Sequence, residues 1–229
     1  MTETLPIIII GTGLAGYSLA REFRKLDQET PLLMLSRDDG HSYSKPMLST
    51  GFTKQKDADN LSMADPGKMA VQLKISIRNF TEVTRIDPDK KQLLIGQEVL
   101  RYQKLVLASG AKVNTLVFPG SDHPNIISIN DLMDYRAFRQ KLEGKKKVLV
   151  MGAGLIGCEY ANDLLNGGYE VTIVDPSASA LSGLIPDFAG RALIEGLESA
   201  GAKFHMQNYV GEVLDQNTHL CAKLNNDLV

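Results

Sequence analysis

Two short apolar runs in this chain have the same surroundings. Residues 7–10 are four isoleucines, and residues 148–151 read Val-Leu-Val-Met. Each run is bounded by turn residues and is too short for an independent helix, which is typical of a buried parallel strand. Each is followed by a predicted helix and a second apolar run, at residues 17–26 and 31–35 in one copy and 158–165 and 170–174 in the other. The pattern predicts strand, helix, strand, twice.

The same glycine pattern, Gly-x-Gly-x-x-Gly, follows the first strand of each copy. Between a strand and a helix, this pattern is typical of a dinucleotide-binding loop. The first glycine allows a tight turn, the second lets a pyrophosphate approach the backbone, and the third lets the helix pack closely on the strand. Backbone N–H groups at the start of the helix favour phosphate. We predict two dinucleotide sites, formed by Gly11, Gly13, Leu14, Ala15 and Gly16 and by Gly152, Gly154, Leu155, Ile156 and Gly157.

The residue that ends the next strand selects the nucleotide. In the second copy it is Asp175. A carboxylate there accepts hydrogen bonds from a ribose diol and repels a 2′-phosphate, so we expect NAD(H) rather than NADP(H). The alternative is that Asp175 caps a turn or helix before Pro176.

The first copy has no acid at the matching position. Ser36 or Arg37 occupies it. Ser36 can hydrogen-bond a hydroxyl group, and Arg37 can pack against an adenine. If the strand runs longer, Asp38 or Asp39 reaches the ribose instead.

The remaining pattern predicts further α/β structure. A polar section, residues 38–67, separates the first copy from later strands. We predict strands at residues 74–83, 91–95 and 105–108, a helix carrying Leu132, Tyr135, Phe138 and Leu142, a helix at 187–200, a strand at 203–206 and a hairpin at 210–214 and 220–224.

Composition excludes several classes of protein. Hydrophobic residues make up 43% and charged residues 23% of the chain, as in a soluble globular protein. The 25 basic and 27 acidic residues nearly balance, which argues against nucleic acid as a partner. No apolar run reaches the roughly 18 residues of a membrane span, so we expect no membrane insertion. Cys158 and Cys221 form neither a disulfide scaffold nor a zinc site; we expect no metal and a cytoplasmic location.

Several motifs together resemble a known family, the two-dinucleotide flavoprotein reductases that share the glutathione-reductase fold. Residues 43–49, Tyr-Ser-Lys-Pro-Met-Leu-Ser, are similar to a Tyr-x-Arg/Lys-Pro-x-Leu-Ser segment of ferredoxin and rubredoxin reductases. The other matching segments are residues 7–16, 81–87, 102–111 and 150–161. The resemblance covers essentially the whole chain. It implies an α/β fold with two Rossmann-like dinucleotide-binding domains in tandem, residues 1–114 for FAD and 115–229 for NAD.

The resemblance also implies cofactors and site residues. FAD is expected on the first loop and NAD(H) on the second. Lys45 and Pro46 would lie near the flavin, the backbone of Val83 would meet the adenine, and Glu159 would lie where flavin and nicotinamide meet. A further stretch would border the FAD: Ala108, Ser109 and Gly110. The alternatives are a polar loop at Lys45 and Pro46, and for Glu159 an exposed acid stabilised by the helix dipole.

Two departures from the family change the expected chemistry. Relatives with a redox disulfide or a single redox cysteine carry it near residues 45–52, where this chain has Ser49 and Thr50. Electrons are therefore expected to leave the flavin directly. Thr50 also replaces a lysine common in ferredoxin reductases. The second departure is length. The family's later Gly-Asp motif and C-terminal domain do not fit after Asp175, so we expect a C-terminally truncated chain.

The expected function is electron transfer from NADH through FAD to a small carrier. A nicotinamide gives up a hydride, and a flavin accepts it and releases single electrons. The resemblance implies rubredoxin or a similar iron protein as acceptor, serving an alkane hydroxylase system. One alternative is an NADH:ferredoxin reductase of another oxygenase or nitrite reductase. An alternative of another class is an inactive nucleotide-binding fragment.

Overall fold

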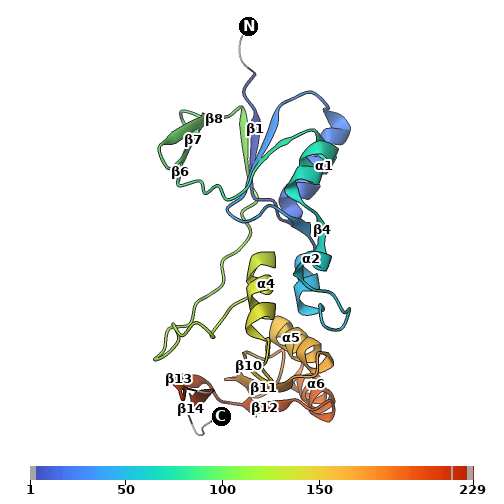
Figure 1. Cartoon of the computed structure of the whole chain (residues 1–229), viewed down its shortest axis with the longest axis vertical. Helices are drawn as coiled ribbons and strands as arrows, with labels where there is room; N and C mark the ends of the chain where they lie inside the picture. Colours follow the sequence, from blue (N-terminus) through green and yellow to red (C-terminus); the bar gives the residue numbers. More distant parts are fainter. Residues whose placement is uncertain (1–3, 218, 226–228) are drawn as a thin grey trace. The chain divides into compact units, whose positions relative to one another are not determined.

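The chain forms two compact units. The computed structural model describes residues 4–217, 219–225 and 229 (Figure 1). One unit contains the residues up to 45 with 58–112 and 131–133; the other contains 46–57, 113–130 and the residues from 134 onward. The division into an FAD domain (1–114) and an NAD domain (115–229) stays a prediction, because compactness does not show which nucleotide a unit binds.

The first unit is built on a parallel sheet. Its four strands stand in the order β5-β2-β1-β9, and β1 pairs in parallel with both β2 and β9. Helix α1 (Leu14–Leu26) connects β1 to β2, as the repeat predicts. The bounds are β1 (Ile7–Ile10), β2 (Leu32–Leu35), β5 (Ser76–Arg78) and β9 (Lys104–Leu107).

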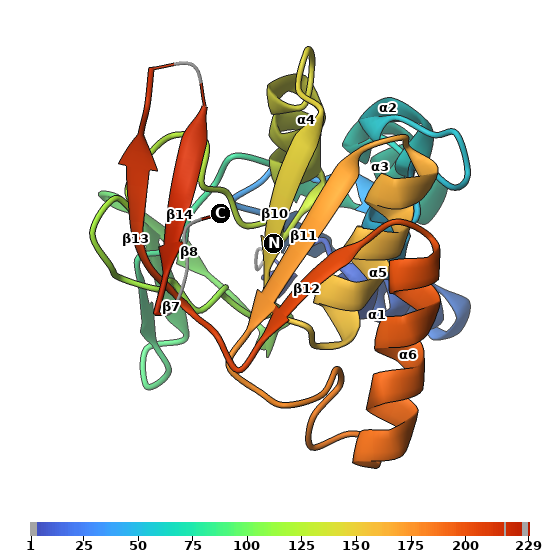
Figure 2. The same cartoon turned by 90° about the horizontal axis from the view of Figure 1, so that it is seen from below.

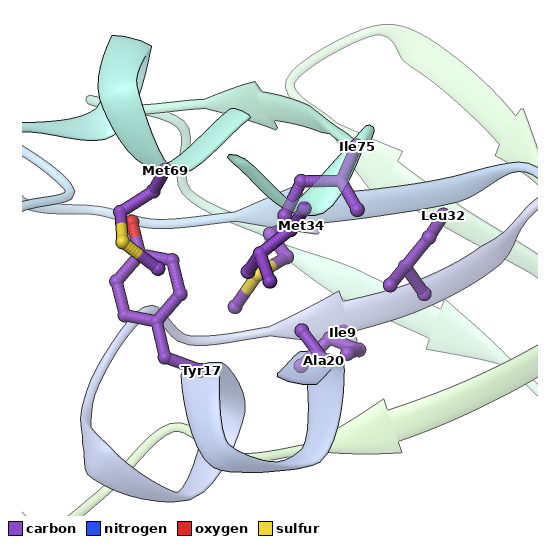
Figure 3. Close-up of a cluster of buried hydrophobic side chains, with 8 residues drawn as sticks. Ile9, Tyr17, Ala20, Leu32, Met34, Met69 and Ile75 are labelled. Carbon is purple, nitrogen blue, oxygen red and sulfur yellow. The ribbon is translucent and has the colours of Figure 1, made fainter. Parts of the chain in front are cut away.

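Side chains that alternate along β1 build two cores. Ile9 packs with Tyr17 of α1 and Met69 of α3 (Pro66–Leu73) in the cluster of Figure 3. Ile8 points the other way and packs with Leu93 of an antiparallel sheet. That sheet contains β6 (Arg85–Asp87), β7 (Gln92–Ile95) and β8 (Glu98–Arg101). The first unit therefore has three layers: helices, parallel sheet, antiparallel sheet.

The second unit repeats this plan. Its parallel sheet has the order β10-β11-β12, with α5 between the first two strands and α6 before the third. Figure 2 shows α5 and α6 on one side of the sheet and the β13–β14 hairpin on the other. Val174 and Leu149 pack with that hairpin. The bounds are α4 (Leu132–Lys141), β10 (Lys147–Met151), α5 (Leu155–Asn166), β11 (Glu170–Asp175), α6 (Asp187–Ser199), β12 (Lys203–Met206), β13 (Val210–Asp215) and β14 (Leu220–Leu224). The predicted tandem α/β fold is confirmed.

The strand predicted at residues 74–83 is wrong over most of its length. Only Ser76–Arg78 forms β5. Lys74 ends α3 in the left-handed conformation (φ 50°), and Phe80 also has a positive φ of 48°, so the chain turns on both sides of β5. The polar section 38–67 contains short elements: β3 (Ser42–Tyr43), the 3-10 helix η1 (Lys45–Ser49), α2 (Ala58–Leu61) and β4 (Ser62–Ala64).

Within the part of the chain that the structure describes, no helix is long and apolar enough to cross a membrane.

Candidate dinucleotide-binding sites

The first glycine of each loop makes the turn out of the strand. Gly11 has φ +113° and Gly152 has φ +108°, values that disfavour any residue with a side chain. The N–H of Gly11 donates to the carbonyl of Leu35 (2.7 Å), and that of Gly152 donates to the carbonyl of Val174 (2.8 Å). The two loops thus have the same conformation and the same anchor to the neighbouring strand.

The third glycine of each loop brings the helix against the turn. A Cβ built on Gly16 would lie 2.0 Å from the carbonyl oxygen of Gly11. The matching Cβ on Gly157 would lie 1.9 Å from the carbonyl oxygen of Gly152. Real Cβ atoms do not approach so closely, so only glycine lets α1 and α5 pack this tightly on their loops.

The second glycine of each loop faces open space. Gly13 and Gly154 are the N-cap residues of α1 and α5. A Cβ built on either would have no atom of the described residues within 4 Å. Glycine has no side chain that could cap a helix, so within those residues the first N–H groups of α1 and α5 have no side-chain cap, and such helix starts favour an anion. Leu14, Leu155 and Ile156 beside them are exposed.

Asp175 touches the second loop. It is the last residue of β11, and its Oδ2 accepts a hydrogen bond from the backbone N–H of Ala153 at 2.7 Å. Its Oδ1 accepts from the N–H of Ser177 at 2.7 Å, which closes a turn after Pro176. The carboxylate therefore caps a turn at Pro176, which is the alternative that the sequence left open. It also lies against the glycine loop, where a ribose is expected.

The first loop reaches a carboxylate indirectly. Strand β2 ends at Leu35, and the hydroxyl of Thr12, inside the glycine loop, donates to the Oγ of Ser36 at 2.7 Å. Ser36 is buried and donates in turn to the carboxylate of Asp38, which also accepts from the N–H of Gly40 (3.0 Å). Arg37 is exposed. The sequence pattern did not single out Thr12, whose position inside the loop was the available signal.

Two more predicted segments border the first loop. The N–H of Thr81 donates to the carbonyl of Ser36 (2.7 Å), so the stretch that leads to Val83 lies at the end of β2. The N–H of Ala108 donates to the carbonyl of Ile10 (2.8 Å), which places the turn through Ser109 and Gly110 beside the loop. Val83 itself precedes β6 rather than lying in a strand. The structure thus places Ala108 and Ser109 beside Gly11, and the stretch before Val83 at the end of β2.

Lys45 and Pro46 open η1, and both are exposed. Their predicted place near a flavin stays a prediction. Cys158 is buried in α5, where its Sγ lies 3.4 Å from the carbonyl oxygen of Ala153. Burial first, and the negative charge of Asp175 second, raise the pKa of this thiol, so it stays protonated at neutral pH.

One face of α5 carries a polar stripe whose contacts the sequence pattern did not reveal. Glu159, Asp163 and Asn166 follow one another at i, i+4 and i+7, which places them on the same side of the helix. All three hydrogen-bond to residues 49–53, which belong to the same compact unit. The Oγ of Ser49 donates to the Oε2 of Glu159 at 2.6 Å.

Two glycine loops of one conformation, each with a polar group at the end of the next strand, form an arrangement that is typical of proteins that bind two dinucleotides. The chain belongs to the pyridine nucleotide-disulphide oxidoreductase family, whose defining pattern matches residues 5–228.

The chain is similar to curated members of the family. It is 51% identical over 200 residues to a rubredoxin-NAD(+) reductase of Alcanivorax borkumensis, covering 87% of this chain and 52% of that protein. It is 43% identical over 214 residues to a rubredoxin-NAD(+) reductase of Acinetobacter baylyi, covering 91% and 54%. The chain therefore spans about half the length of the curated relatives that it matches.

A solved structure shares the fold. The crystal structure of a ferredoxin reductase from Rhodopseudomonas palustris matches with a TM-score of 0.88 at 24% identity, over 98% of this chain and 56% of that one. At this identity the likeness concerns the fold alone.

Proposed function

We propose that the chain carries the nucleotide-binding part of an NADH-dependent flavoprotein reductase, with FAD on the first loop and NADH on the second. The observation that supports this most strongly is the duplicated loop: in both copies a left-handed glycine forms the turn, a glycine faces open space and a glycine packs the helix. Two such loops suit two dinucleotides that exchange electrons.

The second loop suits NADH. Its N–H groups at the start of α5 would hold the pyrophosphate, and Gly154 leaves room for it. Asp175, already in contact with Ala153 of this loop, would accept hydrogen bonds from the adenosine ribose. Leu155 and Ile156, exposed beside Gly154, would cover the bound nucleotide.

The first loop suits FAD. The N–H groups at the start of α1 would hold its pyrophosphate, with Leu14 and Ala15 at the helix start. Ser36 and Asp38 would bind the adenosine ribose, because their hydrogen-bonded chain ends at the loop. The surrounding groups would hold the rest of the nucleotide: Arg37, Lys45, Pro46, Val83, Ala108, Ser109 and Gly110.

Bound together, the two nucleotides supply hydride transfer from nicotinamide to flavin and release of single electrons. We propose rubredoxin or a similar small iron protein as the acceptor. The names of the two similar proteins, both rubredoxin-NAD(+) reductases, support this choice. An alkane hydroxylase supplied by that rubredoxin stays a prediction, tested by coupling the chain, rubredoxin and hydroxylase to NADH oxidation.

The test uses the 229-residue chain, FAD and anaerobic NADH. We expect the flavin absorption band to shift on binding, to bleach with NADH and to change little with NADPH. Addition of oxidised rubredoxin should restore the flavin band as the rubredoxin becomes reduced. If FAD and NADH both fail to bind in calorimetric titrations, the proposal is wrong. Bound flavin that NADH does not reduce would favour the inactive nucleotide-binding fragment.

An acceptor comparison separates the two enzyme alternatives. The same reduced chain is mixed with rubredoxin or with a ferredoxin, and reduction of each carrier is followed by its visible absorption. Faster reduction of the ferredoxin would favour the NADH:ferredoxin reductase.

Replacing Asp175 by alanine should weaken NADH binding and reduce the ratio of the NADH affinity to the NADPH affinity. The change removes an acceptor for the ribose hydroxyls and a charge that repels the 2′-phosphate. Loss of one charge-assisted hydrogen bond corresponds to an affinity loss of about tenfold or more. Calorimetric titration with both nucleotides measures the effect. Glu170→Ala, at the opposite end of the same strand, is the control. An unchanged NADH-to-NADPH ratio in Asp175→Ala would contradict the assignment.

A further inference from the structure

A buried serine holds the acid on α5. The side chain of Ser49 is buried, and its Oγ lies 2.6 Å from Oε2 of Glu159 and 3.1 Å from the carbonyl of Pro46. A hydroxyl has one proton to donate, and the shorter bond, to a charged acceptor, is the stronger. The Ser49 hydroxyl therefore donates its hydrogen bond to the Glu159 carboxylate.

The position of Ser49 is set independently of Glu159. The buried Asp163 accepts hydrogen bonds from the backbone N–H groups of Phe52 (3.1 Å) and Thr53 (2.8 Å). Asn166 donates to the Oγ1 of Thr53 at 3.0 Å. Three hydrogen bonds thus fix the segment that carries Ser49 onto α5. The serine is the fixed partner, and the longer glutamate side chain is the one it orients.

Glu159 lies one helical turn beyond the start of α5. It is the one charged residue in the sequence from 155 to 162, on the second turn of α5 after the glycine loop. If the adenosine ribose lies at Asp175 and the pyrophosphate at the start of α5, the nicotinamide is the part left to meet this turn. A carboxylate has about four acceptor positions, so one hydroxyl leaves room for the amide protons of a carboxamide.

We propose that Ser49 is a positioning residue, whose hydroxyl orients the Glu159 carboxylate toward the nicotinamide carboxamide of NADH. The inference rests on the proposed function, because it requires NADH on the second loop. It assigns to Ser49 a role that the sequence pattern left open.

The test compares NADH with ADP-ribose, which shares every part of NADH except the nicotinamide. Calorimetric titrations use the whole chain and its variants Ser49→Ala, Ser49→Thr and Thr50→Val. The Thr50 change is the matched control, because that hydroxyl bonds to the carbonyl of Met47 (3.1 Å) within the same segment. Wild type should bind NADH more tightly than ADP-ribose.

Ser49→Ala should weaken NADH binding by about threefold to tenfold, the usual range for one hydrogen bond, and leave ADP-ribose binding unchanged. Ser49→Thr keeps a hydroxyl and should restore most of the difference, while Thr50→Val should bind both like wild type. In a Glu159→Ala background, Ser49→Ala should have no further effect, because no acceptor side chain is then left for the hydroxyl to orient.

The outcomes separate the two proposals. If wild type binds neither NADH nor ADP-ribose, the proposed function itself fails. If both bind normally and Ser49→Ala leaves the NADH affinity unchanged, the positioning role alone is overturned. An equal loss for NADH and ADP-ribose would show a structural role for Ser49 and would also overturn it.

Discussion

Gly154→Ala should weaken NADH binding by about a hundredfold or more and leave the fold intact. Gly154 has φ −73° and ψ −179°, which any residue adopts, and a Cβ there has no atom of the described residues within 4 Å. The free energy of unfolding should fall by no more than about 1 kcal/mol, which is the difference between glycine and alanine at an N-cap. The new methyl group would occupy the space proposed for the pyrophosphate and separate it from the helix N–H groups. Loss of two such bonds predicts binding weaker by about a hundredfold or more.

Gly157→Ala, unlike Gly154→Ala, should strongly lower the free energy of unfolding. Its Cβ would lie 1.9 Å from the carbonyl oxygen of Gly152, so α5 must move off the loop. Overpacking of this kind costs about 1–3 kcal/mol, and we expect the upper end because the clash is with backbone. Urea unfolding measures the free energy, and calorimetry measures NADH affinity. Equal stability losses in Gly154→Ala and Gly157→Ala would contradict the distinct roles of the two glycines.

Gly13→Ala in the first loop, compared with Gly154→Ala in the second, tests which loop binds which nucleotide. Gly13 has φ −70° and ψ −173° and also faces open space. Gly13→Ala should weaken FAD binding and leave NADH binding unchanged, whereas Gly154→Ala should do the reverse. If Gly13→Ala weakened NADH binding instead, the order of the two cofactors along the chain would be wrong.

The sequence predicted this part of the fold well because its signals are local. The turn at Gly11, the helix start at Gly13 and the close packing of Gly16 all arise within six residues, and the alternation of Ile8 and Ile9 between two cores follows from strand geometry. Helix α3 was missed although it had a local signal: Asp65 caps it and Pro66 occupies its first turn. Pro66 and Gly67 together also fit the end of the polar section that the sequence predicts at residues 38–67.

The contacts of the segment at residues 46–57 have no local signal. Asp163 and Thr53 are 110 residues apart in sequence, and nothing in their neighbours shows that a helix carboxylate meets two backbone N–H groups. Ser49 is likewise 110 residues from Glu159. A stripe at i, i+4 and i+7 on α5 suggests a polar face, but only packing shows that the face is covered by chain rather than by water.

Asp163→Ala should release this segment from α5. Asp163 is 1% exposed, and its loss leaves the N–H groups of Phe52 and Thr53 without their acceptor. Hydrogen bonds to charged groups contribute about 1.5–3 kcal/mol each, so loss of both should lower the free energy of unfolding by about 3–6 kcal/mol. Asn166→Ala removes one bond to the same segment from a more exposed position and should cost less than about 1 kcal/mol.

Limited trypsin digestion of the native protein locates the effect. Lys54 and Lys56 are exposed in the segment, while Arg139 holds the chain beside them by donating to the carbonyl of Lys56 (2.9 Å) and by lying 3.9 Å above the ring of Phe52. Local opening should speed cleavage at both lysines in Asp163→Ala under conditions where the rest of the protein stays folded. Cleavage at the wild-type rate would contradict the anchoring role.

The same variant connects the anchor to the nucleotide site. If Asp163 fixes the segment and Ser49 transmits that fixed position to Glu159, then Asp163→Ala should lose the preference for NADH over ADP-ribose and also become sensitive to trypsin. Ser49→Ala should lose the preference without the sensitivity, because its segment stays bound to Asp163. Loss of the segment with an unchanged preference for NADH would show that Glu159 is oriented by other groups.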